Sequence, residues 1–194
     1  MILKFIFITL FYSVIALNIL QSSPVSAQQA DKVKKVLSIG DEAPKFVLRD
    51  LSGDFIYLRD YSGKKLRQPW KKREKHVVVI SFFATWCIPC KTEIPILDGI
   101  AAKFTDEPIK IYLVDLNEKE ELVVPFIDSL GVSIPVLFDI YGVVAEKYGV
   151  VALPQTFLID KEGTIRYLSR GLKDAEKFRS SIINNIETWI NVEN

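Results

Sequence analysis

Hydrophobic residues along the chain form both continuous runs and runs with helical spacing. The run Val77–Phe83 (Val-Val-Val-Ile-Ser-Phe-Phe) is almost entirely apolar, with β-branched and aromatic side chains. Such a run is typical of a strand that is buried on both faces of a sheet. After Cys90, apolar residues recur at helical spacing, at Ile94, Leu97, Ile100, Ala101 and Phe104. The pattern therefore predicts a central strand followed directly by a helix.

The same alternation continues to the end of the chain. Residues 109–116 form a second apolar run, and Asn117 with Glu120 predicts a capping box that opens a helix ending at Gly131. The later patterns predict a strand at 135–138, a helix at 141–148, a hairpin with strands 155–160 and 164–168, and a closing helix from Asp174 to Ile190. These alternating strands and helices indicate an α/β fold.

Two short β-prone runs precede the central strand. Residues 46–49 and 55–58 flank the segment 50–54, whose Ser-Gly-Asp content indicates a turn. They predict a β-hairpin added at the N-terminal side of the sheet. We therefore expect one α/β domain with a mixed central sheet, helices on both faces and an N-terminal β-hairpin extension.

The first residues have the character of a targeting segment. Lys4 precedes the apolar run 5–20, and Val25-Ser26-Ala27 follows a polar break. A charged start, a short apolar region and a small-residue site are typical of a secretory signal peptide, with cleavage before Gln28. An uncleaved membrane anchor is the alternative, because the run is close to the shortest length that spans a bilayer, and residues 5–20 would then hold the protein on the membrane. Both interpretations predict an exported protein.

We expect the chain to have three parts, and the charge balance limits its partners. We expect a signal peptide or anchor at 1–27, a linker at 28–39 and one domain at 40–194. Residues 1–27 hold one lysine and no acid, so the remaining chain has 24 basic and 24 acidic side chains. Such a balance gives no general attraction to nucleic acid.

The segment 64–75 holds seven basic residues and one acid. We interpret it as an exposed, solvated loop, and docking to an acidic partner or to lipid headgroups is the alternative.

The chain has two cysteines, Cys87 and Cys90. Their spacing is too short to join distant parts of a fold, and in an oxidising compartment it favours a redox couple. A metal-binding module is the alternative, but zinc needs four ligands and no second cysteine pair exists. The sole histidine, His76, lies before the predicted central strand, at the end away from the cysteines.

The position of the pair indicates its chemistry. Cys87 precedes a predicted helix, whose free N–H groups lower the pKa of a thiol below its usual value of about 8.5. Pro89 suits the first turn, where its missing N–H is not needed. Cys87 is therefore the predicted nucleophile, and Cys90, one turn further in, is the resolving thiol. This chemistry requires no organic cofactor and no metal.

Four segments carry a family resemblance. Residues 83–95, with Trp-Cys-Ile-Pro-Cys-Lys-Thr-Glu, resemble the active-site segment of the thioredoxin superfamily and of its exported TlpA/ResA-like branch. Residues 40–50, 148–150 and 153–160 match the same branch in the same order. The resemblance implies a thioredoxin-like fold from about residue 40 to the end of the chain.

The resemblance also implies roles for further residues. Pro154 matches the cis-proline that faces the redox disulfide, and Leu153 before it would offer its backbone to a substrate. Glu93 matches an acid that assists proton transfer at the cysteines, although the residues alone fit an exposed helical glutamate equally well. We interpret Trp86 as both a packing residue and a substrate platform. Ser81 departs from the pattern of cytoplasmic thioredoxins, which have a buried aspartate there.

The function implied by the resemblance is disulfide reduction in exported proteins, with apocytochrome c as a frequent substrate and a membrane thiol donor that keeps the pair reduced. The expected location is the periplasm or the outer face of the cytoplasmic membrane, and the expected state is a monomer. A peroxiredoxin-like thiol peroxidase is an alternative, because its Gly-Asp-x-Ala-Pro start is similar to residues 40–44. A metal-binding module without catalytic activity is another alternative.

Overall fold

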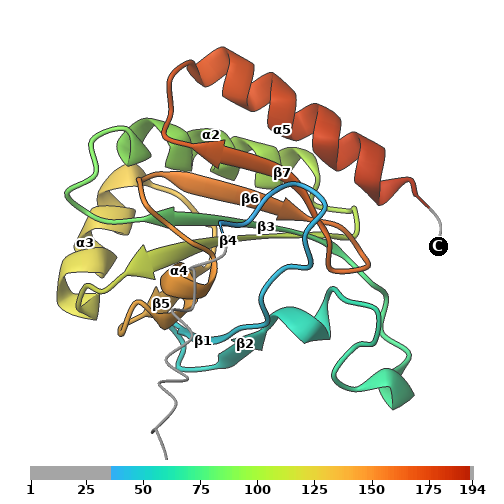
Figure 1. Cartoon of the computed structure of the whole chain (residues 1–194). Coiled ribbons are helices and arrows are strands. Elements are labelled where there is room, and N and C mark those ends of the chain that lie inside the picture. Colours follow the sequence, from blue (N-terminus) through green and yellow to red (C-terminus); the bar gives the residue numbers. More distant parts are fainter. Residues whose placement is uncertain (1–35, 193–194) are drawn as a thin grey trace, which may run out of the picture. The chain divides into compact units, whose positions relative to one another are not determined.

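A mixed seven-stranded sheet organises residues 36–192, the part of the chain that the computed structural model describes (Figure 1). The strand order is β2-β1-β5-β4-β3-β6-β7. The strands are β1 (Val47–Asp50), β2 (Phe55–Tyr57), β3 (Val77–Phe83), β4 (Ile109–Leu116), β5 (Val136–Asp139), β6 (Gln155–Ile159) and β7 (Ile165–Arg170). Strands β3, β4 and β5 are parallel to one another. On one side of them, β6 pairs antiparallel with β3 and with β7, and on the other side β1 pairs antiparallel with β5 and with β2. The predicted α/β class and mixed sheet are confirmed.

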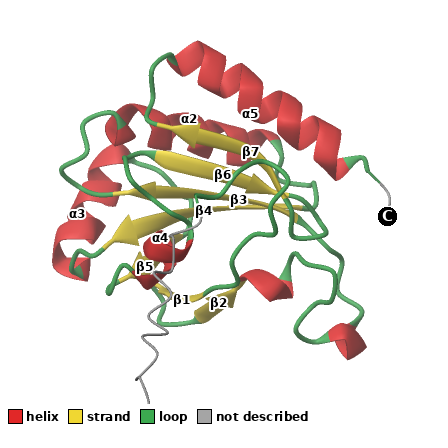
Figure 2. Cartoon of the chain, viewed as in Figure 1, coloured by secondary structure: helices red, strands yellow, loops and turns green. Residues whose placement is uncertain are grey.

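Helices cover both faces of the sheet (Figure 2). They are α2 (Cys90–Lys103), α3 (Glu120–Leu130), α4 (Val143–Lys147) and α5 (Ala175–Ile190), with short 3-10 turns η1 (Leu58–Asp60) and η2 (Pro69–Lys71). Side chains from α2, α3 and α5 share one hydrophobic cluster with one face of the sheet, whereas α4 and β1 share a second cluster with the other face.

Strand β3 shows how the sequence produces this layering. All seven of its residues are buried, and their side chains alternate between the two clusters. Val77, Val79 and Phe83 belong to the α2 side, whereas Val78, Ile80 and Phe82 belong to the α4 side. Because the side-chain period of a strand is two, Ser81 must face α2. The single polar residue of the central strand therefore lies under the helix that carries the cysteines.

One predicted helix start is wrong. Helix α3 begins at Glu120 with Lys119 as its N-cap, so Asn117 and Glu120 form no capping box. Asn117 has a left-handed backbone with φ of 62°, and its N–H donates to the carbonyl of Asp139. The helix does end at Gly131, which also adopts a left-handed conformation with φ of 62°. Such a conformation suits glycine, which has no Cβ to clash.

The basic segment 64–75 is not wholly solvated. Leu66 is buried, and the Arg67 guanidinium makes two hydrogen bonds of 2.8 Å with the Asp60 carboxylate. These contacts attach the base of the segment to η1, so the expected simple loop is partly packed. Trp70 and the neighbouring lysines remain exposed.

The start of the folded part lies slightly before Gly40, the predicted first residue of the domain. Leu37 is buried in the second cluster, and its carbonyl accepts a hydrogen bond from Arg170. The predicted signal peptide or anchor and most of the predicted linker lie outside the described residues. Within residues 36–192, none of the helices combines the length and apolar character that crossing a bilayer requires.

Candidate active site

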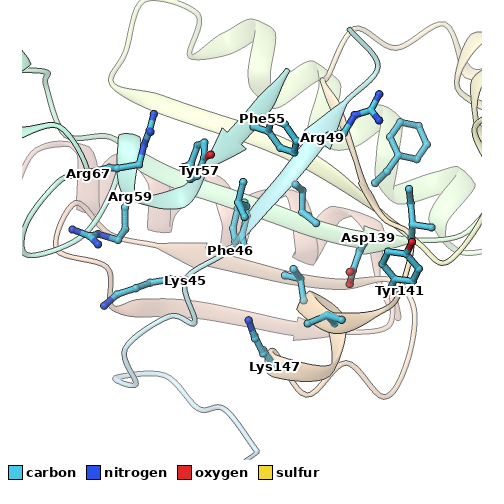
Figure 3. A pocket seen from close by; sticks show the side chains of 16 residues that line it. Lys45, Phe46, Arg49, Phe55, Tyr57, Arg59, Arg67, Asp139, Tyr141 and Lys147 are labelled. Atoms are coloured by element: carbon cyan, nitrogen blue, oxygen red, sulfur yellow. The ribbon is translucent and has the colours of Figure 1, made fainter. Parts of the chain in front are cut away.

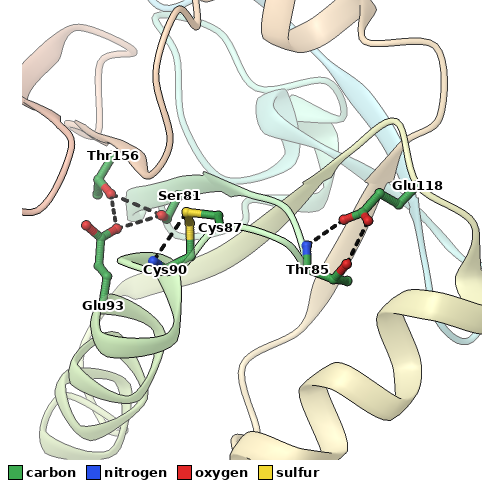
Figure 4. The surroundings of a disulfide bond; sticks show 7 residues. All are labelled: Ser81, Thr85, Cys87, Cys90, Glu93, Glu118 and Thr156. Carbon is green, nitrogen blue, oxygen red and sulfur yellow. Dashed lines mark hydrogen bonds between the residues drawn. A yellow bond between two sulfur atoms is a disulfide. The ribbon is translucent and has the colours of Figure 1, made fainter.

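The two cysteines lie where strand β3 ends and helix α2 begins (Figure 4). They form a disulfide with an S–S distance of 1.99 Å and a Cα–Cα distance of 5.3 Å. Cys90 is the first residue of α2 and is fully buried, whereas Cys87 is 4% exposed. Cys87 is thus the more exposed residue of the pair, as its position in the sequence predicts.

The backbone at the start of helix α2 donates a hydrogen bond to Cys87. The backbone N–H of Cys90 donates to Cys87 Sγ at an N–S distance of 3.3 Å. Pro89, which has no N–H to lose, occupies the N-cap position. When the disulfide is reduced, the same N–H and the positive end of the helix dipole favour the thiolate form of Cys87.

Glu93 is buried, which excludes its interpretation as an exposed helical glutamate. It lies one turn after Cys90 in α2, and its Oε1 accepts hydrogen bonds from the Ser81 and Thr156 hydroxyls (Figure 4). Its other oxygen, Oε2, has no hydrogen-bond partner among residues 36–192. Burial raises the pKa of Glu93, although the two hydroxyl donors act in the opposite direction. The site therefore contains a carboxyl group that holds a proton more readily than an exposed glutamate.

The hydroxyl groups of Ser81 and Thr156 hold the Glu93 carboxylate. Ser81 and Thr156 are paired residues on the antiparallel strands β3 and β6, and their hydroxyl oxygens, Thr156 Oγ1 and Ser81 Oγ, lie 3.0 Å apart. Cytoplasmic thioredoxins have a buried aspartate at the position of Ser81. In this chain the Ser81 hydroxyl donates instead to the carboxylate of Glu93 on helix α2. Sequence reasoning missed Thr156, although its position two residues after Pro154 was the available signal.

The Leu153–Pro154 peptide bond is cis, as the resemblance implies. Pro154 is buried, and its carbonyl accepts a hydrogen bond of 2.7 Å from the N–H of Gly171. Leu153 is half-buried and packs against the hydrophobic cluster that contains both cysteines. Leu153 also packs against the second cluster, so the segment before β6 lies at the boundary between the two clusters.

Trp86 is 69% exposed, so its predicted packing role is wrong. Ile88, on the other side of Cys87 in sequence, is 78% exposed. Cys87 is thus flanked in sequence by two large apolar side chains that contact solvent. Exposed apolar groups beside a reactive atom are typical of a surface that binds a partner.

Two acidic residues, Glu118 and Asp115, support the loop before the cysteines. Neither residue was predicted from the sequence. The Glu118 carboxylate accepts hydrogen bonds from the Thr85 N–H at 2.6 Å and from the Thr85 hydroxyl at 2.7 Å (Figure 4). The Glu118 N–H donates to the buried Asp115 carboxylate at 3.0 Å. Burial, with the nearby acid Glu118, raises the pKa of Asp115 to about 7. The available signal was that parallel strands β3 and β4 end at the same edge of the sheet.

His76 takes no part in this site. It precedes β3, at the opposite end from Cys87, and its ring packs edge-on against Tyr61 with centroids 5.7 Å apart. Burial lowers the pKa of its imidazole. Within residues 36–192, no three histidine, cysteine or acidic side chains are grouped so that they could hold a metal ion.

Comparison with known proteins agrees with this geometry. The AhpC/TSA family matches residues 39–168. The thiol-disulfide oxidoreductase ResA of Bacillus thuringiensis subsp. konkukian (strain 97-27) is 33% identical over 141 residues, which cover 73% of this chain and 75% of that protein. ResA of Bacillus subtilis (strain 168) is 36% identical over 132 residues, which cover 68% of this chain and 67% of that protein.

Solved structures give the same result. The crystal structure of a putative thiol:disulfide interchange protein DsbE from Chlorobium tepidum has a TM-score of 0.68 and 27% sequence identity. The match covers 80% of this chain and 99% of that one. The fold, the buried cysteine pair and the relatives therefore agree, and this chain belongs to the AhpC/TSA family, within it to the ResA-like thiol-disulfide oxidoreductases with a thioredoxin-like fold.

Proposed function

We propose that this protein reduces disulfide bonds in selected exported proteins. The observation that supports the proposal best is the disulfide between Cys87 and Cys90 at the start of α2, in which Cys87 is slightly exposed and Cys90 is fully buried. The relatives named thiol-disulfide oxidoreductases support the same chemistry. No metal or organic cofactor is needed for it.

The reaction moves two electrons from the dithiol to the substrate. The Cys87 thiolate attacks one sulfur of the substrate disulfide, the substrate S–S bond breaks, and the leaving thiolate takes a proton. Cys90 then loses its proton and attacks Cys87 Sγ. The Cys87–Cys90 disulfide forms, the mixed disulfide breaks, and the second substrate thiol leaves after protonation. The protein is oxidised and the substrate is reduced.

Glu93 is the group that moves the proton at Cys90 in this proposal. Residues three apart on a helix are neighbours, which places Glu93 beside Cys90. Its raised pKa and its Oε2, which has no hydrogen-bond partner among the described residues, suit a group that accepts and returns a proton. Ser81 and Thr156 hold the other oxygen and so orient the carboxyl group.

Trp86, Leu153 and Pro154 bind the substrate in this proposal. Trp86 offers an exposed flat ring next to Cys87, and Leu153 offers backbone groups to an extended chain segment. The partners are disulfide-containing exported proteins, with apocytochrome c as a candidate, and a membrane thiol donor that reduces the Cys87–Cys90 disulfide. The protein acts as a monomer in the periplasm or on the outer face of the cytoplasmic membrane, exported through residues 1–27.

The reduction potential of the Cys87–Cys90 couple tests the direction of electron flow. Equilibration with glutathione or dithiothreitol buffers gives this value. A reductase is expected near or below about −250 mV, toward the thioredoxin end of the scale. A value near about −120 mV would instead identify an oxidant that introduces disulfides.

Cysteine variants test the roles of the two sulfurs. Cys87→Ser is expected to lose all disulfide exchange, whereas Cys90→Ser is expected to accumulate mixed disulfides with its substrates. An active Cys87→Ser protein would contradict the assignment. Stoichiometric consumption of hydroperoxide by the wild-type protein would instead support the thiol peroxidase alternative.

A further inference from the structure

A large pocket lies away from the disulfide, between the β1–β2 hairpin and the segment that follows β5 (Figure 3). Its volume is about 640 Å³, which is within the usual range for sites that bind ligands. We call it the hairpin pocket. Its lining residues are Lys45, Phe46, Val47, Leu48, Arg49, Phe55, Tyr57, Arg59, Arg67, Phe138, Asp139, Ile140, Tyr141, Val143, Val144 and Lys147.

Most of the lining is apolar, and much of it contacts solvent. Tyr141 is 88% exposed and Phe55 is 61% exposed, and Val47, Ile140 and Val143 are each more than two-fifths exposed. Soluble proteins rarely expose so many large apolar side chains in one place unless a partner covers them. The hairpin pocket is therefore suited to receive apolar side chains.

The charged residues around the hairpin pocket are nearly all basic (Figure 3). The Arg67 side chain is bound to Asp60, but the side chains of Arg49 and Lys147 form no hydrogen bond or ion pair within residues 36–192. The one acidic residue of the lining, Asp139, is buried and accepts a hydrogen bond from the N–H of Ala145. The charge complementarity therefore favours an occupant that is both apolar and acidic.

A second hollow adjoins the hairpin pocket, and one of its lining residues supports the loop before the cysteines. It has a volume of about 320 Å³ and shares Arg49, Phe138 and Ile140 with the hairpin pocket. Glu118 also lines it, and the Glu118 carboxylate holds Thr85, two residues before Cys87. The second hollow is lined by four acids, Asp50, Glu118, Glu120 and Glu121, so the basic surface that suits acidic side chains is that of the hairpin pocket and not that of the second hollow.

We propose that the hairpin pocket binds an acidic, apolar segment of the polypeptide whose disulfide Cys87 attacks. The inference rests on the proposed reductase function and adds a second point of recognition to it. Leucine or phenylalanine side chains of the substrate enter the pocket, and nearby aspartate or glutamate side chains pair with Arg49 and Lys147. Because both points lie on one chain, binding at the pocket raises the effective concentration of the disulfide at Cys87.

Synthetic disulfide substrates test this inference on the reduced full-length protein. The first peptide carries Asp-Leu-Phe-Asp-Leu, joined by a Gly-Ser linker to a cysteine in a disulfide with glutathione. In the second peptide lysine replaces both aspartates, and the third has the linker and cysteine only. Linkers of 4, 8 and 12 residues are compared, because an extended chain spans at most about 3.3–3.6 Å per residue. The readout is kcat/KM for reduction.

The acidic peptide is expected to exceed the linker-only peptide about tenfold at its best linker length. The lysine peptide is expected to show no advantage. Arg49→Gln combined with Lys147→Gln should remove most of the advantage while leaving reduction of the linker-only peptide unchanged. Lys173→Gln combined with Lys177→Gln is the matched control, since it removes two charges from exposed residues that line neither hollow, and it should keep the full advantage.

Equal rates for the acidic and linker-only peptides at every linker length would overturn the inference, and so would an advantage that survives the Arg49 and Lys147 substitutions. Failure to reduce any of the three peptides would instead contradict the proposed function. A fluorescent dodecanoate and the cysteine-free acidic peptide are also titrated separately into the protein. Binding of dodecanoate without binding of the peptide would overturn the inference in favour of a lipid ligand.

Discussion

Glu118 stabilises the loop that leads to Cys87 through two hydrogen bonds to one residue, Thr85. Hydrogen bonds that involve a charged group contribute about 1.5–3 kcal/mol to stability. We expect Glu118→Ala to lower the free energy of unfolding of the oxidised protein by about 1–3 kcal/mol, as measured by urea denaturation. Glu121→Ala, at an exposed position of α3, should change it by less than about 0.5 kcal/mol. A Glu118→Ala protein as stable as the wild type would contradict this role.

Asp115 gives the stability a dependence on pH. Its pKa is about 7 in the folded protein, whereas an aspartate in an unfolded chain ionises near about 3.9. Between these values the folded state binds more protons than the unfolded state, so the free energy of unfolding falls as the pH rises. One proton contributes at most about 1.4 kcal/mol per pH unit.

Urea denaturation at a series of pH values checks this effect. Relative to the wild type, Asp115→Asn should show a smaller decline between about pH 4 and pH 7, because it lacks the Asp115 proton, whereas Glu93, whose pKa is also raised, still contributes. Asp128→Asn, on the exposed side of α3, is the control and should follow the wild-type profile. The same decline in Asp115→Asn would assign it to another group.

Residues of the candidate site differ in how far the sequence could predict them. Cys87 and Cys90 are adjacent in sequence to a helix start, so their environment follows from local pattern. The partners of Glu93 come from two strands that meet only in the folded sheet, with Ser81 on β3 and Thr156 on β6. Sequence spacing contains no information on that pairing. The exposure of Trp86 likewise depends on what the rest of the chain leaves uncovered.

At the scale of elements, the N-terminus of α5 follows the local rules of helix capping. The Asp174 side chain accepts a hydrogen bond of 3.0 Å from the Lys177 N–H. We expect Asp174→Ala to lower the free energy of unfolding by about 0.5–2 kcal/mol. Asp174→Asn keeps an acceptor oxygen and should cost less. Thermal and urea unfolding of the two variants provide the comparison, and equal losses in both would argue against the cap.

Helix α3 shows where the same local rules fail. Asn117 and Glu120 have the spacing of a capping box, but Asn117 is used in the turn after β4, where its N–H bonds to Asp139 on the next strand. Because that tertiary contact holds Asn117 in a left-handed conformation, the helix begins later. Within residues 36–192, the Asp174 side chain forms no hydrogen bond with a strand, so its sequence signal and its structure agree.

At the scale of the whole molecule, the hydrophobic pattern predicted the strands and helices but not their spatial order. The β1–β2 hairpin was predicted from residues 46–58, yet its pairing with β5 joins segments nearly ninety residues apart. That pairing creates the hairpin pocket, since residues on both sides of it line the hollow. A site made by an added hairpin therefore has no local signature in the sequence.

The two hydrophobic clusters lie on opposite faces of one sheet, so we expect them to unfold together. Leu97 on α2 and Leu137 on β5 are fully buried, one in each cluster. Truncation of either to alanine should lower the free energy of unfolding by about 2–5 kcal/mol. The double variant should lose the sum of the two within about 0.5 kcal/mol, since the side chains lie on opposite faces of the sheet. Each protein should unfold in one transition when fluorescence and circular dichroism are compared. Separate transitions in Leu97→Ala would show that the α2 side, which carries both cysteines, unfolds independently of the side that forms the hairpin pocket.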